Sequence, residues 1–348
     1  MTLSSVPEVM EYRGEFGAEL VLFLPFCGWL NKLGLLKDHV ISTYHGMRCF
    51  YDDLDCKEIV ERAEPREFVR PRQRAEWLPV KDEHAYMAPN VCHSFPDLRK
   101  KFSKLGSLDT LFKERKPLLV IHNKYNIEWE REPLNFIDEA TLATLFERFS
   151  HDFNVVYFRH GILGASPGYT EDHTPMEPLN DLEVVRQFPR VSLFEDLLEA
   201  HGQGLDTNQM KNLIYSQCHR FITVQGGGAH HIAMYSGSLM LIAHRAGNEC
   251  FGAYDEGYYN FMAPVPPVRM ICTSPKELIA ASAALEDCVW ITDRIHVDAK
   301  HRDILMARSA RRFCSMARAI YNQRRRAKAE DQAAAASLEA APLETLSE

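Results

Sequence analysis

The spacing of hydrophobic and polar residues changes repeatedly between that of strands and that of helices in the second half of the chain. Continuous apolar runs at residues 118-124 and 153-160 are typical of buried strands, and residues 137-150 between them have helical spacing. A strand-helix-strand order of this length is typical of a parallel sheet covered by helices. The same pattern predicts further helices at residues 179-188, 207-218 and 275-286 and through Met234, and further strands at residues 190-194, 220-225, 238-244 and 268-273. We therefore expect one doubly wound domain over residues 117-292.

The first part of the chain has a weaker pattern. Residues 18-26 form an unbroken apolar run that predicts a buried strand, and residues 39-54 indicate a second strand. Residues 57-116 are charged and broken by prolines, with a helix and then a linker expected in their basic final part. This change near Lys113 predicts a domain boundary, so that residues 1-116 form a separate N-terminal α/β domain.

The C-terminal end has a strong helical pattern rich in arginine over residues 298-330, followed by an alanine-rich acidic stretch. We expect a helix within residues 293-330 that packs back on the N-terminal domain, and a disordered tail over residues 331-348. The alternative for this helix is contact with a membrane surface, because anionic lipids attract arginine side chains.

Composition limits the classes of function. A chain of 348 residues with 46% hydrophobic residues can bury a large core, and a formal net charge of -8 gives no general reason to expect nucleic-acid binding. No stretch is apolar enough for a membrane span, and the N-terminus lacks the pattern of a signal peptide. We therefore expect a cytoplasmic protein, peripheral at the inner face of a membrane if the arginine-rich helix binds lipid. Nine scattered cysteines without a CxxC pair favour buried or free thiols over a zinc site or disulfides.

Three consecutive glycines, Gly226 to Gly228, follow the strand expected at residues 220-225. Ligands of parallel sheets bind at the carboxyl ends of the strands, and glycines there let the backbone approach a phosphate. Gln225 and the glycines are therefore candidate phosphate ligands, and the alternative is that the glycines only form a tight turn. His230 and His231 point about 100° apart on a helix, and we favour His230 as the one that faces a ligand. A metal site is not favoured here, because this pair lacks a spacing of three or four and a third ligand.

The order helix NQMKNLIYSQC, strand HRFITVQ, glycine turn GGGAHHIAMYSG and strand SLMLIAHR resembles the donor-binding half of GT-B-fold glycosyltransferases. The likeness is to inverting families such as heptosyltransferases, fucosyltransferases and bacterial polysaccharide transferases, and it extends from Leu118 to Leu285. It implies an α/β fold of two Rossmann-like domains facing a cleft. It also implies a nucleotide-sugar donor on the second domain and a glycan, lipid-linked or other hydroxyl acceptor on the first.

The resemblance further implies which residues bind the donor. Lys124 or Arg159 would neutralise the phosphate leaving group, so that an inverting displacement would need no metal and no other cofactor. The full set of implied donor contacts is Asn123, Lys124, Arg159, His160, Gly226, Gly227, Gly228, Ala229 and His230.

An inverting transfer needs a general base that takes the proton of the acceptor hydroxyl. Our catalytic candidates are Asp53 and His45 in the expected N-terminal domain. Spacing alone does not separate them from other candidates, which are His39, Asp52, Asp55, Glu83 and His84. The stretch YDDLD also contains a DxD pattern, which metal-dependent transferases of another fold use, but acidic triplets on solvated surfaces are common.

Two other functions stay open. Arg159, His160 and Gly161 after a strand resemble the phosphate-binding and nucleophilic tripeptide of histidine phosphatases, with His244 as the second histidine. In that family the tripeptide follows the first strand of the domain, whereas here a strand-helix unit precedes it. The other possibility is a non-catalytic nucleotide-sugar or carbohydrate-binding module, which would bind a donor without turnover.

Overall fold

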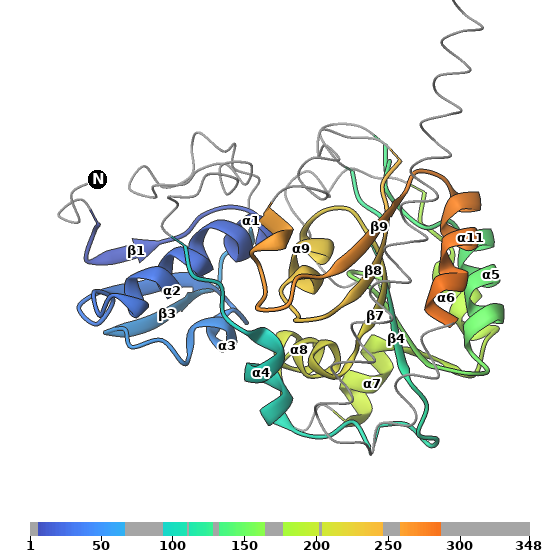
Figure 1. Ribbon diagram of the computed structural model, residues 1–348, viewed down its shortest axis with the longest axis horizontal. Helices are drawn as coiled ribbons and strands as arrows, with labels where there is room; N and C mark the ends of the chain where they lie inside the picture. Colours follow the sequence, from blue (N-terminus) through green and yellow to red (C-terminus); the bar gives the residue numbers. More distant parts are fainter. Residues whose placement is uncertain are drawn as a thin grey trace, which may run out of the picture.

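A computed structural model describes residues 6–66, 93–109, 111–127, 132–163, 177–201, 204–245 and 258–286 of the chain. Two parallel sheets organise these residues, one of six strands with helices on both faces and one of three strands beside it (Figure 1). The expected α/β class with parallel sheets is confirmed.

The six-stranded sheet contains every strand that was predicted between residues 117 and 273. Its order is β6-β5-β4-β7-β8-β9, and all neighbouring strands are parallel. The chain therefore winds outward from β4 in one direction and then, from β7, in the other. Between β4 and β7 lies the topological switch point, beyond which open parallel sheets bind ligands. The strands are β4 (Leu118–Asn123), β5 (Asn154–Arg159), β6 (Val191–Leu193), β7 (Arg220–Val224), β8 (Leu239–Ala243) and β9 (Val268–Cys272).

Helices cover both faces of this sheet because alternate strand residues point to opposite sides. Leu119 and Ile121 belong to one buried cluster, while Val120 between them belongs to the other. Only α7 was not anticipated among these helices. Figure 1 shows α5 (Glu139–Phe149), α6 (Asp181–Arg186) and α11 (Pro275–Glu286) along one face, and α7 (Phe194–His201), α8 (Thr207–Gln217) and α9 (Gly227–Ala233) on the other.

Aspartate side chains fix the starts of two of these helices. Asp138 accepts a hydrogen bond from the backbone N–H of Thr141 at 2.9 Å at the start of α5. Asp206 forms a capping box with Gln209 at the start of α8, with hydrogen bonds of 2.8 and 2.9 Å. A cap of this kind stabilises a helix by about 1 kcal/mol. The first turns of α8, which lie near the carboxyl edge of the sheet, are therefore held in a defined orientation.

The small sheet consists of β1 (Val9–Glu11), β2 (Val40–Tyr44) and β3 (Glu58–Arg62), in that order and all parallel. The strand expected within residues 39-54 is confirmed as β2, and it is followed by α3 (Arg48–Tyr51). The outer strands were not predicted, because β1 is very short and β3 is mostly charged.

The strand predicted at residues 18-26 is wrong. This stretch is helical and comprises α1 (Phe16–Ala18), the π-helix η2 (Glu19–Phe23) and the start of α2 (Leu24–Lys32). An unbroken apolar run does not distinguish a buried strand from a helix that is buried on all sides. Pro25 in the first turn of α2 was the overlooked signal, because proline is favoured at that position of a helix.

Hydrogen bonds connect the segment between the two sheets to the elements around the larger one, and several of them come from Arg99. The expected helix in the basic stretch is α4 (Leu98–Phe102), continued by η5 (Ser103–Leu105). Arg99 on α4 donates hydrogen bonds to the carbonyls of Ser236 at 2.7 Å and Ser216 at 2.6 Å. Buried side chains of both sheets also form one continuous hydrophobic cluster. The division into domains at residue 116 stays a prediction.

The helix and tail predicted over residues 293-330 and 331-348 lie outside the described residues. Among the helices that the structure does describe, none combines the length and hydropathy needed to cross a bilayer. Among the cysteines in the described ranges most are buried thiols, as expected, and the buried ones are Cys27, Cys49, Cys218 and Cys272.

Candidate functional site

The residues that follow β4, β5 and β7 lie together at the carboxyl edge of the six-stranded sheet. Asn123 at the end of β4 is paired in register with Arg159 at the end of β5, and β7 lies on the other side of β4. The Lys124 ammonium lies against Gly226, since a Cβ atom on this glycine would be 3.2 Å from Nζ. The predicted donor-binding residues are therefore neighbours at the topological switch point, and their role as ligands stays a prediction.

Asn123 is fully buried, and hydrogen bonds within the protein occupy the donors and acceptors of its side chain. Its Nδ2 donates to the Ile137 carbonyl at 2.9 Å and to the Tyr157 hydroxyl at 3.1 Å. Its Oδ1 accepts from the backbone N–H of Lys124 at 3.0 Å and of Ile137 at 2.9 Å. An amide with both donors and both acceptor positions occupied has none left for a ligand. The Asn123 side chain therefore positions Lys124, and contact of Asn123 with a donor stays a prediction.

Arg159 is 8% exposed and forms an ion pair inside the protein. Its Nε and Nη2 donate to the two carboxylate oxygens of Asp181 at 2.5 and 2.8 Å, and the Tyr157 hydroxyl donates to the same carboxylate at 2.5 Å. The bidentate pair is neutral as a unit. Arg159 therefore has no uncompensated charge for a phosphate, which both the transferase and the phosphatase interpretations asked of it. His160 beside it is exposed, and Gln225 at the end of β7 is buried.

Backbone geometry or close packing within the chain favours glycine at each of these three positions. Gly226 has a φ of +106°, in the region that disfavours other residues. A Cβ atom on Gly227 would lie 3.2 Å from the backbone nitrogen of Gly17, and one on Gly228 would lie 2.5 Å from the His122 ring. Packing within the chain thus accounts for Gly227 and Gly228 without a ligand, and contact of their backbone with a diphosphate stays a prediction.

His230 and His231 point in different directions, as expected for neighbours on a helix. His231 is fully buried, with Nε2 2.7 Å from Oδ1 of Asn212, and burial followed by the charge of Lys211 holds its pKa well below the usual range. His230 has Nδ1 at 2.8 Å from the Tyr259 hydroxyl. Within the described ranges no three His, Cys, Asp or Glu side chains gather as a metal site requires. His231 belongs to the core, and His230 as a ligand residue stays a prediction.

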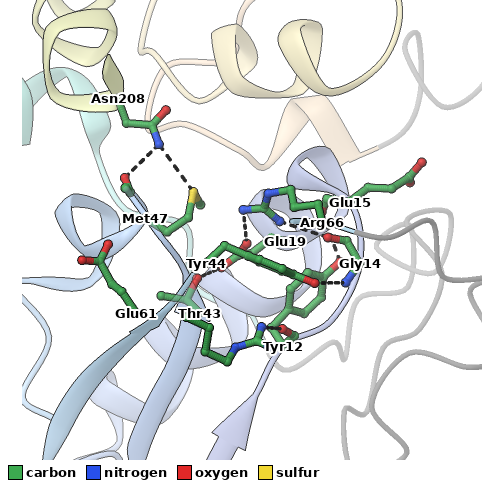
Figure 2. A network of polar contacts seen from close by, with 12 residues as sticks. Tyr12, Gly14, Glu15, Glu19, Thr43, Tyr44, Met47, Glu61, Arg66 and Asn208 are labelled. Atoms are coloured by element: carbon green, nitrogen blue, oxygen red, sulfur yellow. Dashed lines mark hydrogen bonds and ion pairs between the residues drawn. The ribbon is translucent and has the colours of Figure 1, made fainter. Parts of the chain in front are cut away.

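The carboxyl ends of the small sheet face α8 and α9. Gly17, which follows β1, packs against Gly227 of α9, and a Cβ atom on Gly17 would lie 2.7 Å from the Gly227 Cα atom. Asn208 of α8 donates a hydrogen bond to the carbonyl of Gly46, which follows β2, at 2.8 Å (Figure 2). Residues that follow strands of both sheets therefore meet in one region.

A buried carboxylate organises the ends of the small sheet. Glu19 of η2 lies beside Arg66 in Figure 2, with 2.6 Å between its Oε2 and Nη2 of the arginine, and its Oε1 accepts from the Tyr51 hydroxyl at 2.9 Å. Arg66 also donates to the carbonyl of Gly14 at 3.0 Å, and its guanidinium carbon lies 4.2 Å from the centre of the Tyr44 ring. These contacts hold Arg66 over the carboxyl ends of β1 and β2.

The two catalytic candidates occupy different places. His45 follows β2, its side chain is exposed, and it adjoins the Gly46 that contacts α8. Asp53 follows α3, is more than half exposed and forms an ion pair with Lys101. Only His45 therefore lies where residues of the two sheets meet. Two other candidates lie outside the described residues: Glu83 and His84.

Lys211, which the sequence analysis did not single out, lies in the same region. It is in the second turn of α8, and its side chain is 8% exposed. Its Nζ lies 4.9 Å from the centre of the Phe16 ring, after β1, and 5.3 Å from that of Phe158 on β5. The signal was present in the sequence, because Lys211 shares the apolar stripe of an amphipathic helix with Met210 and Ile214.

Glu195 is the second residue that was missed. It is in the first turn of α7, directly after β6, which places it at the carboxyl edge of the large sheet. Its Oε2 is buried and makes no hydrogen bond in the described part of the chain. Burial raises the pKa of this carboxyl to about 7, although the nearby Arg159 charge opposes the shift. A carboxyl that exchanges its proton near neutral pH can act as a donor or an acceptor for a ligand.

No family model matches this sequence, and no curated protein matches it at a significant level. Among solved structures, one similar chain is a crystal structure of a glycosyl transferase family 9 protein from Veillonella parvula DSM 2008. That likeness has a TM-score of 0.41 and 10% sequence identity, and it covers 87% of this chain and 99% of that chain. A TM-score this low at this identity does not establish a common fold. The chemistry of this protein is therefore inferred from its own residues.

Proposed function

We propose that this protein is a glycosyltransferase that moves a sugar from a nucleotide-sugar donor to a hydroxyl group of a glycan or lipid-linked acceptor. The observation that carries the proposal is the topological switch point between β4 and β7, where Lys124 lies against Gly226. Doubly wound parallel sheets bind nucleotides at this point, where the backbone at the strand ends can approach the phosphates. A lysine there supplies positive charge opposite a diphosphate.

The proposed reaction is a direct displacement with inversion. The acceptor oxygen bonds to the anomeric carbon, the bond from that carbon to the diphosphate oxygen breaks, and a base takes the acceptor proton. Lys124 would hydrogen-bond the diphosphate as its negative charge grows, which stabilises the transition state more than the bound donor. Because this side chain supplies the charge, the proposal includes no metal or cofactor.

His45 is the base that we propose for the acceptor hydroxyl. Its exposed imidazole follows β2, where residues of the small sheet meet α8, whereas Lys101 engages Asp53 elsewhere. In this arrangement the donor binds the large sheet and the acceptor approaches from the small sheet. Such a reaction would serve polysaccharide or glycoconjugate synthesis.

Donor binding is tested by a thermal-shift screen of the full chain against nucleoside diphosphates and nucleotide sugars, because a ligand that binds only the folded state raises Tm. We expect at least one nucleotide to raise Tm. Lys124→Met should weaken its binding by about tenfold or more, which corresponds to about 1.4 kcal/mol. Lys104→Met, at an exposed position of η5, is the matched control and should bind normally. A wild-type chain that responds to no nucleotide would sink the proposal.

Turnover is tested by measuring nucleoside diphosphate release from a bound donor in the presence of hydroxyl acceptors. His45→Ala should lower the rate by about a hundredfold without changing donor affinity, as expected for a lost general base. His151→Ala removes an exposed histidine near the amino end of β5, at the opposite edge of the sheet from His45 and Lys124, and should leave the rate unchanged. Donor binding without any turnover would instead favour a non-catalytic binding module.

A further inference from the structure

Lys211 is a buried cation without a counter-charge in the part of the chain that the structure describes. No hydrogen bond or ion pair joins its Nζ to a described residue, and its side chain is 8% exposed. The rings of Phe16 and Phe158, 4.9 and 5.3 Å from Nζ, attract the ammonium but do not satisfy its three N–H donors as oxygen atoms would.

The groups around Lys211 supply no direct anionic partner among the described residues, and the nearby Arg66 is itself paired with Glu19. Arg66 also lies over the Phe16 ring, with 5.6 Å between its guanidinium carbon and the ring centre. The Cys49 thiol stays neutral, because burial raises its pKa to about 12. Asp206 has a weaker effect on Lys211 than Arg66 has, and its carboxylate already caps α8. The titratable and charged groups that face Lys211 are Cys49, Arg66, His122, Asp206 and His231.

An uncompensated cation in this position destabilises the fold. Burial lowers the pKa of Lys211 to about 8, so the amine keeps its proton through most of the neutral range at the expense of desolvation. An apolar side chain of similar length would fill the same space without this penalty. Titratable groups whose burial is not compensated are characteristic of binding and catalytic sites.

We propose that Lys211 is the centre of an oxyanion-binding site between the segment after β1 and the large sheet, where a phosphate or carboxylate of a small ligand supplies the missing counter-charge. His122 lies beside it, with its ring centre 4.7 Å from that of Phe158 and its Nδ1 2.9 Å from the Tyr215 hydroxyl. When this hydroxyl donates to Nδ1, the hydrogen of the neutral ring is on Nε2, which lies near Gly228. Lys124 also lies close enough to His122 to lower its pKa further.

This site goes beyond the proposed sugar transfer, since it requires neither a nucleotide nor a sugar. The oxyanion could belong to a diphosphate on the side of the large sheet or to an acidic group on the side of the small sheet. Inorganic pyrophosphate and glucuronate separate these two sources, because one carries only phosphate oxygens and the other only a carboxylate.

The test is calorimetric titration of the full-length chain with pyrophosphate and, separately, with glucuronate at pH 7. We expect one of the two to bind, and we expect Lys211→Met to weaken that binding at least about tenfold, the loss of one charge-assisted contact. Lys104→Met is the matched control and should bind as the wild type does. Lys211→Arg keeps the charge and should retain most of the affinity. Retained affinity would show that the loss in Lys211→Met comes from the missing charge and not from misfolding.

A second readout uses the proton. An anion that binds beside Lys211 raises its pKa, so binding at pH 8, where the amine is about half protonated, should take up part of a proton in the wild type and less in Lys211→Met; titrations in two buffers of different ionisation enthalpy measure this difference. The proposal is overturned if neither probe binds the wild type, or if Lys211→Met binds the active probe as tightly as Lys104→Met does. Lys124→Met separates the two proposals, since loss of nucleotide binding there with intact pyrophosphate or glucuronate binding would leave the Lys211 site standing.

Discussion

Arg159 and Lys211 are both buried cations near the carboxyl edge of the six-stranded sheet, but their electrostatic surroundings differ. Arg159 is neutralised by Asp181 through two hydrogen bonds of 2.5 and 2.8 Å, whereas Lys211 lies between two aromatic rings without an anionic partner among the described residues. Position at a strand end therefore indicates the region where we propose that a ligand binds. Charge compensation identifies which cation in that region is available to it.

The largest loss of stability should come from breaking the ion pair between Arg159 and Asp181. Asp181→Ala leaves the Arg159 guanidinium buried and uncompensated, so we expect the free energy of unfolding to fall by about 3–5 kcal/mol. Urea unfolding measures this change. A loss below about 1 kcal/mol would mean that the pair is well solvated and that the contrast with Lys211 is wrong.

Removing both Arg159 and Asp181 should change the free energy of unfolding much less than removing Asp181 alone. In the double variant Arg159→Met with Asp181→Leu, no uncompensated charge remains, and apolar groups fill the space. We expect the unfolding free energy to fall by only about 1–2 kcal/mol, because buried ion pairs contribute little net stability relative to apolar packing, whereas the buried Tyr157 hydroxyl loses its acceptor. A double-mutant cycle with the two single variants measures the coupling, and additive losses would contradict the interpretation.

Lys211→Met should have the opposite sign and stabilise the ligand-free protein by about 2 kcal/mol, because it removes a desolvated charge. The pH dependence is a further check. The folded-state pKa of about 8 lies below the ordinary 10.5, so between these values the unfolded chain holds a proton that the folded protein has released. Wild-type stability from this group should therefore rise with pH from about 8 to about 10.5, and in Lys211→Met this rise should be absent. Lys104→Met should follow the wild type.

The smallest effect is expected at Glu195, which is only partly buried. Its pKa is raised from 4.5 to about 7, so its contribution to stability is complete below pH 4.5 and is lost as pH rises through 7. Glu195→Gln should remove this dependence and make the protein slightly more stable than the wild type at pH 8. Glu199→Gln, on the exposed side of the same helix, is the control, and an identical pH profile for both variants would exclude a buried Glu195 carboxyl.

The large sheet was predictable because its strands and helices have different periods. Strands such as β4 and β7 are short apolar runs separated by amphipathic helices of ordinary length, and each run has a turn at its end. The N-terminal part was harder, because η2 and the first turn of α2 are buried on all sides and their sequence has no helical stripe. β1 and β3 carry too few apolar residues to be recognised without their neighbour β2.

The sequence predicted which candidate residues lie close together, but it did not predict what their side chains contact. Chain order alone brings the residues after β4, β5 and β7 to one edge, so Lys124 and Gly226 could be anticipated as neighbours. The partners of Asn123 and Arg159 could not, because a hydrogen bond to Ile137 or an ion pair with Asp181 depends on how distant segments pack. Lys211 carried a local signal, a cation on an apolar helix face, which becomes meaningful once β5 and the segment after β1 are known to enclose it.

The contact between Gly17 and Gly227 constrains how this sequence can evolve. The two backbones approach so closely that a side chain on either residue would displace the other, although one follows β1 and the other begins α9. In related chains with the same packing, both positions should therefore remain glycine. A relative that accepts a larger residue at one of them would have its small sheet displaced from the large one, so this pair would serve as a sequence marker for the relative placement of the two sheets across the family.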